Sequence, residues 1–152
     1  CWEENFLDWF AGRGFPSYAV SLRGHGRSAG INGLAAGGSV PPEILAEAMF
    51  AGTIEQGSLE RHHRRMQRES RRALMDMSGW ALPQLWRQRR TDMLVLGASH
   101  DALISPLLAQ STASLLGAEY RLLVGLGHAL MLDAGWQCAA EAIADWLGEQ
   151  GF

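Results

Sequence analysis

The sequence predicts an α/β fold, in which a parallel sheet is flanked by helices. Three observations favour it. Strand and helix patterns alternate in the tail of the chain, and a helix, a strand-forming run and a glycine loop follow one another at its amino end. The 152 residues are 47% hydrophobic and 19% charged, enough for one buried core. We therefore expect a single domain over residues 1–152.

The amino-terminal segment predicts a helix and then a strand. Over residues 2–11, large apolar side chains recur at helical spacing, and they are Trp2, Phe6, Trp9 and Phe10. Gly12 and Gly14 are expected to end this helix. Residues 15–22 are rich in strand formers and lead into a turn-prone loop at residues 23–28.

The middle of the chain predicts mainly helices. Residues 31–38 are almost all small, so a strand there would be weak. The Pro41–Pro42 pair opens a helix that continues to Met49, because proline is tolerated in a first turn. A polar, arginine-rich helix is expected at 58–77, and Trp80, Pro83 and Trp86 mark a turn and a further short helix. Together, residues 43–90 are predicted to form a helical lid inserted in the domain.

The tail predicts the sheet and the helices that cover it. Strands are expected at 93–96 and 120–124, and helices at 106–116, ended by Gly117, and at 136–147. Ligand chemistry in a parallel sheet gathers at the carboxyl ends of its strands. The loops that leave those ends span residues 23–28, 97–106 and 125–132.

The charge and the histidine spacing argue against several kinds of partner. The net charge of −3 gives no reason to expect nucleic acid as a partner. All 13 basic residues are arginines, and nine of them lie between Arg61 and Arg90. A phosphate-binding helix is an alternative there. The acids interspersed among the arginines favour a solvated face of the lid instead. The adjacent His62 and His63 would point about 100° apart on a helix, so neither metal nor cofactor is expected.

Cysteine use and hydropathy predict a cytoplasmic protein without a membrane span. Cys1 and Cys138 lie near opposite ends and indicate neither a disulfide framework nor a metal site. No apolar run approaches the roughly 18–20 residues that cross a bilayer. The amino end carries charges where a signal peptide would be apolar. Because the sequence begins at Cys1 and not at Met, an upstream signal is left open.

Two residues in the tail are candidates for catalysis. Asp101 follows the strand at 93–96, and His128 follows the next strand, at 120–124. Adjacent strands lie about 4.8 Å apart, which would bring the two side chains within hydrogen-bonding reach. An aspartate in such a place is commonly a turn former, and a lone histidine is commonly structural. Their joint occurrence, acid before histidine, favours half of a nucleophilic triad.

Several segments of the chain together resemble a known family of enzymes. Residues 92–146 look like the carboxyl half of α/β-hydrolases, whose triad order is nucleophile, acid, histidine. The Arg-Gly-His-Gly-Arg-Ser at 23–28 is similar to a loop of the lysophospholipase and monoglyceride-lipase branch, although Ser21 stands where that branch usually has aspartate. Residues 31–42 and the lid match more loosely. The resemblance implies a carboxylic-ester hydrolase with Asp101 and His128 as catalytic residues and a small ester or acyl ligand.

The resemblance lacks a nucleophile. The G-x-S-x-G spacing occurs at Gly26–Gly30, around Ser28, but it overlaps the loop that the resemblance places after the fourth strand and not at the nucleophile. The nearest approach elsewhere, at 37–41, places Pro41 where the second glycine belongs, so Ser39 is better explained as a turn serine. The family's block with the fifth strand and the nucleophile is absent between Gly30 and Ile31, and so is the third strand with its oxyanion loop. Each missing oxyanion donor would cost about 3 kcal/mol. We therefore expect an inactive chain; the alternative is a non-catalytic ligand-binding or interaction module on a hydrolase scaffold.

The missing strands have a consequence for folding. In the family's strand order, the strand at 15–22 would face a gap of about 14 Å, three strand spacings. Either this strand pairs with residues 31–38, or two chains share their exposed sheet edges, or the fold is only marginally stable. The sequence thus predicts a rearranged sheet or a homodimer.

Overall fold

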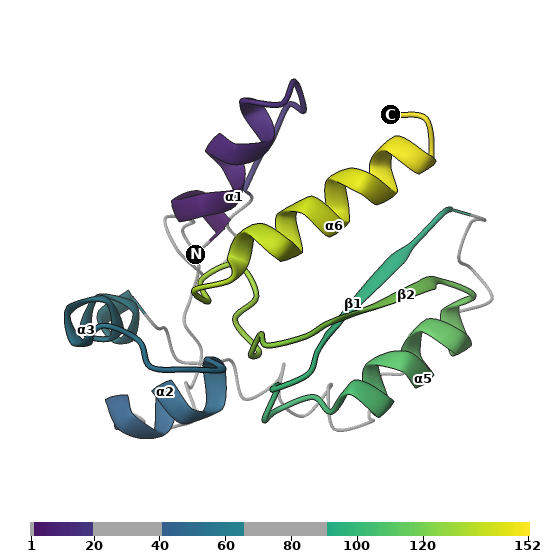
Figure 1. The fold of residues 1–152 in the computed structure, drawn as a ribbon. Coiled ribbons are helices and arrows are strands. Elements are labelled where there is room, and N and C mark those ends of the chain that lie inside the picture. Colours follow the sequence, from purple (N-terminus) through teal and green to yellow (C-terminus); the bar gives the residue numbers. More distant parts are fainter. Residues whose placement is uncertain (1, 20–40, 66–90) are drawn as a thin grey trace, which may run out of the picture.

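The computed structural model describes residues 2–19, 41–65 and 91–152. They form a mixed α/β structure with five helices and a two-stranded parallel sheet (Figure 1). In chain order the elements are α1 (Trp2–Ala11), α2 (Pro42–Met49), α3 (Gln56–Arg65), β1 (Leu94–Ala98), α5 (Pro106–Leu116), β2 (Glu119–Leu123) and α6 (Trp136–Glu149).

The sheet and its two helices form a layered unit. Strands β1 and β2 run parallel, with Leu94 opposite Glu119 and Ala98 opposite Leu123, so both strands end at the same edge. Helix α5 connects them and covers one face of the sheet, while α6 lies across the other (Figure 1). This arrangement confirms the predicted strand–helix–strand–helix tail, with boundaries that differ by one or two residues.

Local signals explain the bounds of α5. The Ser105 hydroxyl accepts a hydrogen bond from the Leu108 N–H at 3.3 Å, and Pro106 occupies the first turn. Gly117 ends the helix in the left-handed conformation, with φ of 65°, which glycine adopts without steric cost. The predicted stop at Gly117 is confirmed.

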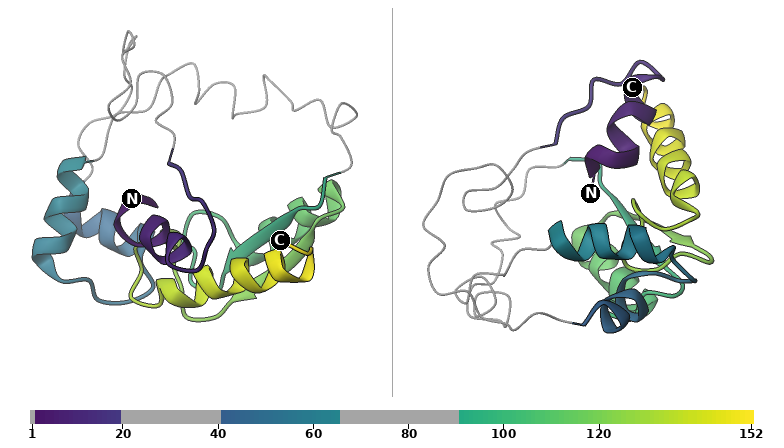
Figure 2. Two further views of the ribbon diagram at one scale, coloured as in Figure 1. Left: turned by 90° about the horizontal axis from the view of Figure 1, so that it is seen from above. Right: turned by 90° about the vertical axis from the view of Figure 1, so that its left-hand side faces the viewer.

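The core lies between α1, α6 and the sheet. Phe6 and Phe10 of α1 are buried, with their ring centroids 5.7 Å apart in an edge-on arrangement. Ala139 and Ala140 of α6 are fully buried, and their small side chains let α1 pack closely (Figure 2). The predicted amphipathic helix at the amino end is therefore confirmed.

The predicted strand at 15–22 is wrong over its described part, because residues 15–19 form no regular element. The Phe15 N–H bonds to the Phe10 carbonyl at 3.0 Å, and the two rings lie 6.1 Å apart, so the chain turns back onto α1. Pro16 offers no N–H for strand pairing. Tyr18, expected within the strand, is 85% exposed.

Several predictions fall outside the described residues. They concern the loop at 23–28, the weak strand at 31–38, Ser39, the second half of the arginine-rich helix, and Trp80 with Trp86. The helix after Pro41 is confirmed as α2, and α3 confirms the first part of the polar helix. Whether residues 43–90 act as a lid stays a prediction. Of the helices that the structure describes, none has the length and apolar character needed to cross a membrane.

Candidate active site

The structure brings Asp101 and His128 together at the carboxyl edge of the sheet. Asp101 lies in the turn after β1, and His128 lies in the loop after β2. The His128 Nδ1 atom is 3.0 Å from one carboxylate oxygen of Asp101 and 3.1 Å from the other. The His128 side chain is 30% exposed and that of Asp101 is 10% exposed. The predicted contact between Asp101 and His128 is present, and the His128 ring is partly open to solvent.

The Asp101 carboxylate is held by its own turn as well as by the ring. The Leu103 and Ile104 N–H groups each donate to Oδ1 at 2.8 Å. Burial alone would raise the pKa of the Asp101 carboxyl. The Ile104 N–H lowers this pKa, and the His128 ring and the Leu103 N–H lower it further, so the net pKa lies below its ordinary value. Asp101 is both the turn former and the partner of the histidine.

Ser99 ties the two loops together. Its N–H donates to the Leu123 carbonyl at 2.9 Å, and its hydroxyl accepts from the Gly125 N–H at 2.8 Å. Gly125 has a φ of 81°, which an L side chain rarely adopts. The His100 N–H adds a bond to the Leu126 carbonyl at 3.0 Å. These bonds fix the turn that carries Asp101 against the loop that carries His128.

Asp133 holds the histidine loop from the other side. It is 5% exposed, and its Oδ2 accepts from the Gly127 N–H at 2.9 Å and from the Ala51 N–H at 3.0 Å. Its Oδ1 accepts from the Ala134 N–H at 2.7 Å. The Ala129 N–H donates to the Met49 carbonyl at 2.8 Å. On one side of His128, Gly127 thus shares the Asp133 carboxylate with Ala51, and on the other side Ala129 bonds to the last residue of α2.

Sequence reasoning missed Asp133 as a positioning residue. The one available signal is a single acid in the otherwise uncharged stretch 129–140, because an acid in apolar surroundings is commonly buried with partners. Gly127 lets the histidine loop approach the α2–α3 connection closely. A Cβ on Gly127 would lie 2.6 Å from the Ala51 nitrogen and 2.7 Å from the Phe50 carbonyl carbon, so the close approach requires glycine.

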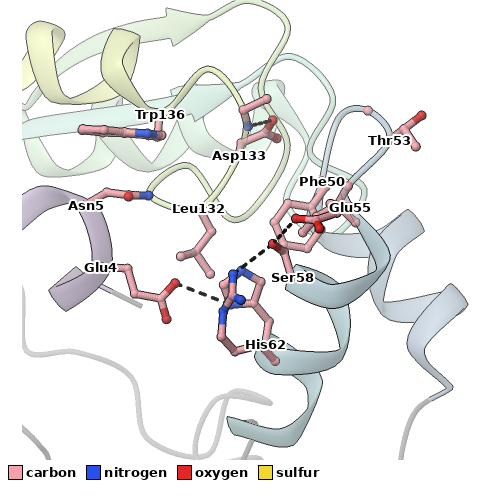
Figure 3. A pocket seen from close by; sticks show the side chains of 14 residues that line it. Glu4, Asn5, Phe50, Thr53, Glu55, Ser58, His62, Leu132, Asp133 and Trp136 are labelled. Atoms are coloured by element: carbon pink, nitrogen blue, oxygen red, sulfur yellow. Dashed lines mark hydrogen bonds and ion pairs between the residues drawn. The ribbon is translucent and has the colours of Figure 1, made fainter.

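A pocket of about 350 Å³ adjoins the histidine loop (Figure 3). It lies between α1, α3, the α2–α3 connection and the start of α6. On its polar wall, His62 pairs with Glu4 at 3.8 Å, and Ser58 donates to Glu55 at 3.2 Å. Its apolar lining is Phe50, Ile54, Leu132 and Trp136. Asp101 and His128 do not line the pocket. Asp133 does, and because it also holds the Gly127 N–H, it connects the pocket to the loop that carries His128.

The described residues supply no nucleophile to the pair. No serine, threonine or cysteine among them is hydrogen-bonded to the His128 ring, and the Ser99 hydroxyl lies 2.8 Å from His100 Nδ1 instead. Ser39 is outside the described residues. Within residues 2–19, 41–65 and 91–152, no group of three or more His, Cys, Asp or Glu side chains could hold a metal ion.

Comparisons with protein-family models, with characterised proteins and with solved structures gave no match. The resemblance to α/β-hydrolases therefore stays a prediction from the sequence. What can be said of the site rests on the contacts of Asp101, His128 and their supporting residues.

Proposed function

We propose that Asp101 and His128 are the acid and the base of a serine-hydrolase type of site for carboxylic esters. The observation that carries the proposal is the pair of contacts from His128 Nδ1 to the Asp101 carboxylate, at the strand edge where such sites lie. The family resemblance supplies the ester as the substrate class.

The geometry suits the chemistry of a general base. With its proton on Nδ1, the ring donates to Asp101, and Nε2 then holds the lone pair that can accept a proton from a hydroxyl. The imidazolium formed would face a carboxylate whose pKa is held low, so the carboxylate stays charged and stabilises it. The proton would return from Nε2 to the leaving alkoxide of the ester.

We further propose that this chain does not hydrolyse esters by itself. Acyl transfer needs a nucleophilic hydroxyl and preorganised donors for the developing oxyanion. The G-x-S-x-G at residues 26–30 lies in the loop that resembles the one after the family's fourth strand, and no described hydroxyl bonds to His128. An unassisted imidazole is expected to give only the slow ester cleavage of free histidine.

One experiment tests the pair itself. In proton NMR, the Nδ1 proton of a ring bonded to a carboxylate resonates far downfield, and we expect this signal in the wild-type chain. Asp101→Asn should abolish it, because the amide no longer offers a charged acceptor to the ring. Asp92→Asn, at an exposed aspartate before β1, is the matched control. A downfield signal that survives Asp101→Asn would remove the basis of the proposal.

A second experiment tests the missing nucleophile. A fluorophosphonate probe and a short-chain nitrophenyl ester should give neither labelling nor turnover above that of His128→Ala. Labelling that His128→Ala abolishes would show that the chain contains a nucleophile after all. Ser28→Ala and Ser39→Ala would then reveal whether either serine is that residue.

A second candidate function is binding of an acyl ligand without catalysis, and the pocket beside the histidine loop favours it. Its volume falls in the range of small-molecule sites, and Phe50, Ile54, Leu132 and Trp136 give an apolar part to a lining in which polar and charged side chains, Arg61 among them, are the majority. Octanoate can serve as the probe, with tryptophan fluorescence to follow Trp136. Ser58→Phe should fill the pocket and abolish the response, while Ser114→Phe on α5 should leave it intact. No saturable response in the wild type would exclude this function for octanoate.

The proposal keeps the cytoplasmic location expected from the sequence. Cys138 is a free and exposed thiol. Such a thiol suits a reducing compartment.

A further inference from the structure

Helix α5 has an inverted distribution of side chains. It turns alanines to the sheet, with Ala113 only 1% exposed, and turns leucines outward. The outward residues, together with two from the preceding turn, form a surface that we call the leucine face; they are Leu103, Ile104, Leu107, Leu108 and Leu115. Leu107 is 73% exposed and Leu115 is 70% exposed. A surface helix normally places its large apolar residues inward.

The leucine face is free of charge as well as apolar. Residues 102–118 contain no Asp, Glu, Arg, Lys or His. Charged residues are depleted at the centres of protein interfaces, whereas a solvated helix usually carries them. From the exposed fractions, the five side chains present on the order of 500 Å² of apolar surface, at the upper end of what a monomer ordinarily exposes.

The hydroxyl groups on this helix are already satisfied. Ser111 donates to the Leu107 carbonyl at 2.8 Å, and Thr112 donates to the Leu108 carbonyl at 2.9 Å. Ser114 makes the same bond, to the Gln110 carbonyl, at 3.0 Å. A buried O–H without a partner would cost about 1–3 kcal/mol. The leucine face can therefore be covered by a dry partner without leaving these donors unpaired.

We infer that the leucine face binds a second copy of this chain, in a twofold-symmetric dimer with α5 packed against α5. An isologous interface places the same patch on both sides, and an uncharged patch can face itself without like-charge repulsion. Two copies of the leucine face would together bury about 1,000 Å² of apolar surface, which is the lower bound for a specific interface. Helix α5 is also firmly placed, because the Tyr120 hydroxyl of β2 donates to the Pro106 carbonyl at 3.1 Å.

This dimer differs from the pairing of sheet edges that the sequence predicted, because it uses the outer face of a helix. It is independent of the proposed catalysis and would form whether or not His128 acts as a base. A lipid surface is the competing occupant. Helices that lie on membranes usually carry basic residues on their polar face, and residues 102–118 have none.

Sedimentation equilibrium of the full chain over a range of concentrations tests the inference. We expect a monomer–dimer equilibrium in the wild type. In Leu107→Glu/Leu115→Glu, the acids of the two copies would face one another across the axis, and the dissociation constant should rise at least roughly 100-fold. Both leucines are exposed, so circular dichroism should show an unchanged fold.

Phe152→Glu is the matched control, because Phe152 is 79% exposed and follows α6, on the opposite face of the sheet from α5. This variant should dimerise like the wild type. A wild-type monomer at all concentrations, or a dimer lost in Phe152→Glu but kept in the double variant, would overturn the inference. So would flotation of the wild type with phosphatidylcholine vesicles that the double variant abolishes, since the face would then bind lipid.

Discussion

The two loops at the carboxyl edge of the sheet are held in different ways. The turn after β1 is local: Asp101 accepts the N–H groups of residues two and three positions further along the chain. The loop after β2 is held from a distance, because Asp133 joins Gly127 to Ala51, 82 residues from Asp133 in sequence. The acid of the candidate pair is thus placed by its own turn, and the histidine is placed by tertiary structure.

This difference predicts which changes disturb which partner. A change in the β1 turn should alter the acid and its charge while the fold survives. A change at the Asp133 anchor should release His128 together with the contacts of α2 and its connection to α3. The largest effects on stability are therefore expected at the anchor of the histidine loop and not at the candidate pair itself.

Asp133→Ala is expected to have the largest effect. It removes the acceptor of three backbone N–H groups at a site with 5% exposure, so buried donors are left unpaired. The free energy of unfolding should fall by about 3–5 kcal/mol, as measured by urea denaturation. Asp145→Ala, at an exposed aspartate of α6, is the control and should change it by less than about 0.5 kcal/mol. A similarly small loss in Asp133→Ala would mean that the anchor is not needed.

Gly127→Ala is expected to have the next largest effect on the free energy of unfolding. The added methyl group would collide with backbone atoms of Phe50 and Ala51, which cannot move aside as a flexible side chain would. We expect a loss of about 1–3 kcal/mol and a change in the His128 resonances, since the loop must separate from the α2–α3 connection. Gly148→Ala is the control: nothing lies within 4 Å of a Cβ there, and alanine favours the helix. If Gly127→Ala is as stable as the wild type, the histidine loop is not held by this contact.

The same difference between local and distant contacts explains which parts of the molecule the sequence could predict. The bounds of α5 and the turn at Asp101 are set by residues within a few positions, Ser105, Pro106 and Gly117 among them, so local rules were sufficient. The meeting of Asp101 and His128 followed from one further step, the pairing of consecutive parallel strands.

The rest depended on contacts that no local pattern records. The strand formers in 15–22 predicted a strand, but Phe15 turns back onto Phe10, and the described residues offer 15–19 no neighbouring strand. The role of Asp133 depends on where Ala51 lies in space. The leucines of α5 fit a helical pattern, but which of its faces meets the sheet is decided by packing, and it is the alanines that do.

Asp101→Asn should cost less, and its effect should depend on pH. Because the folded-state pKa of this carboxyl is lowered, its charge stabilises the fold above its ordinary pKa of 3.8, and that contribution is lost as the pH falls through the lower folded value. At neutral pH we expect a loss of about 1–2 kcal/mol from the weakened bonds to the ring and the turn. The difference from the wild type should shrink in urea titrations below about pH 4, while Asp92→Asn should show no such dependence. A difference that is constant with pH would mean that the charge of Asp101 is not what the site uses.

Ser99→Ala should have the smallest effect. It leaves the Gly125 N–H without its acceptor but keeps the backbone bond from the Ser99 N–H to the Leu123 carbonyl. Because Ser99 is only half-buried, water can replace part of the lost bond, and we expect a loss of about 0.5–1 kcal/mol. Amide hydrogen exchange offers the sharper measurement: the Gly125 N–H should exchange faster while the Gly127 N–H, which Asp133 holds, stays protected. Loss of protection at both amides would show that the two ends of the histidine loop open together, and that the local and distant supports are not separable.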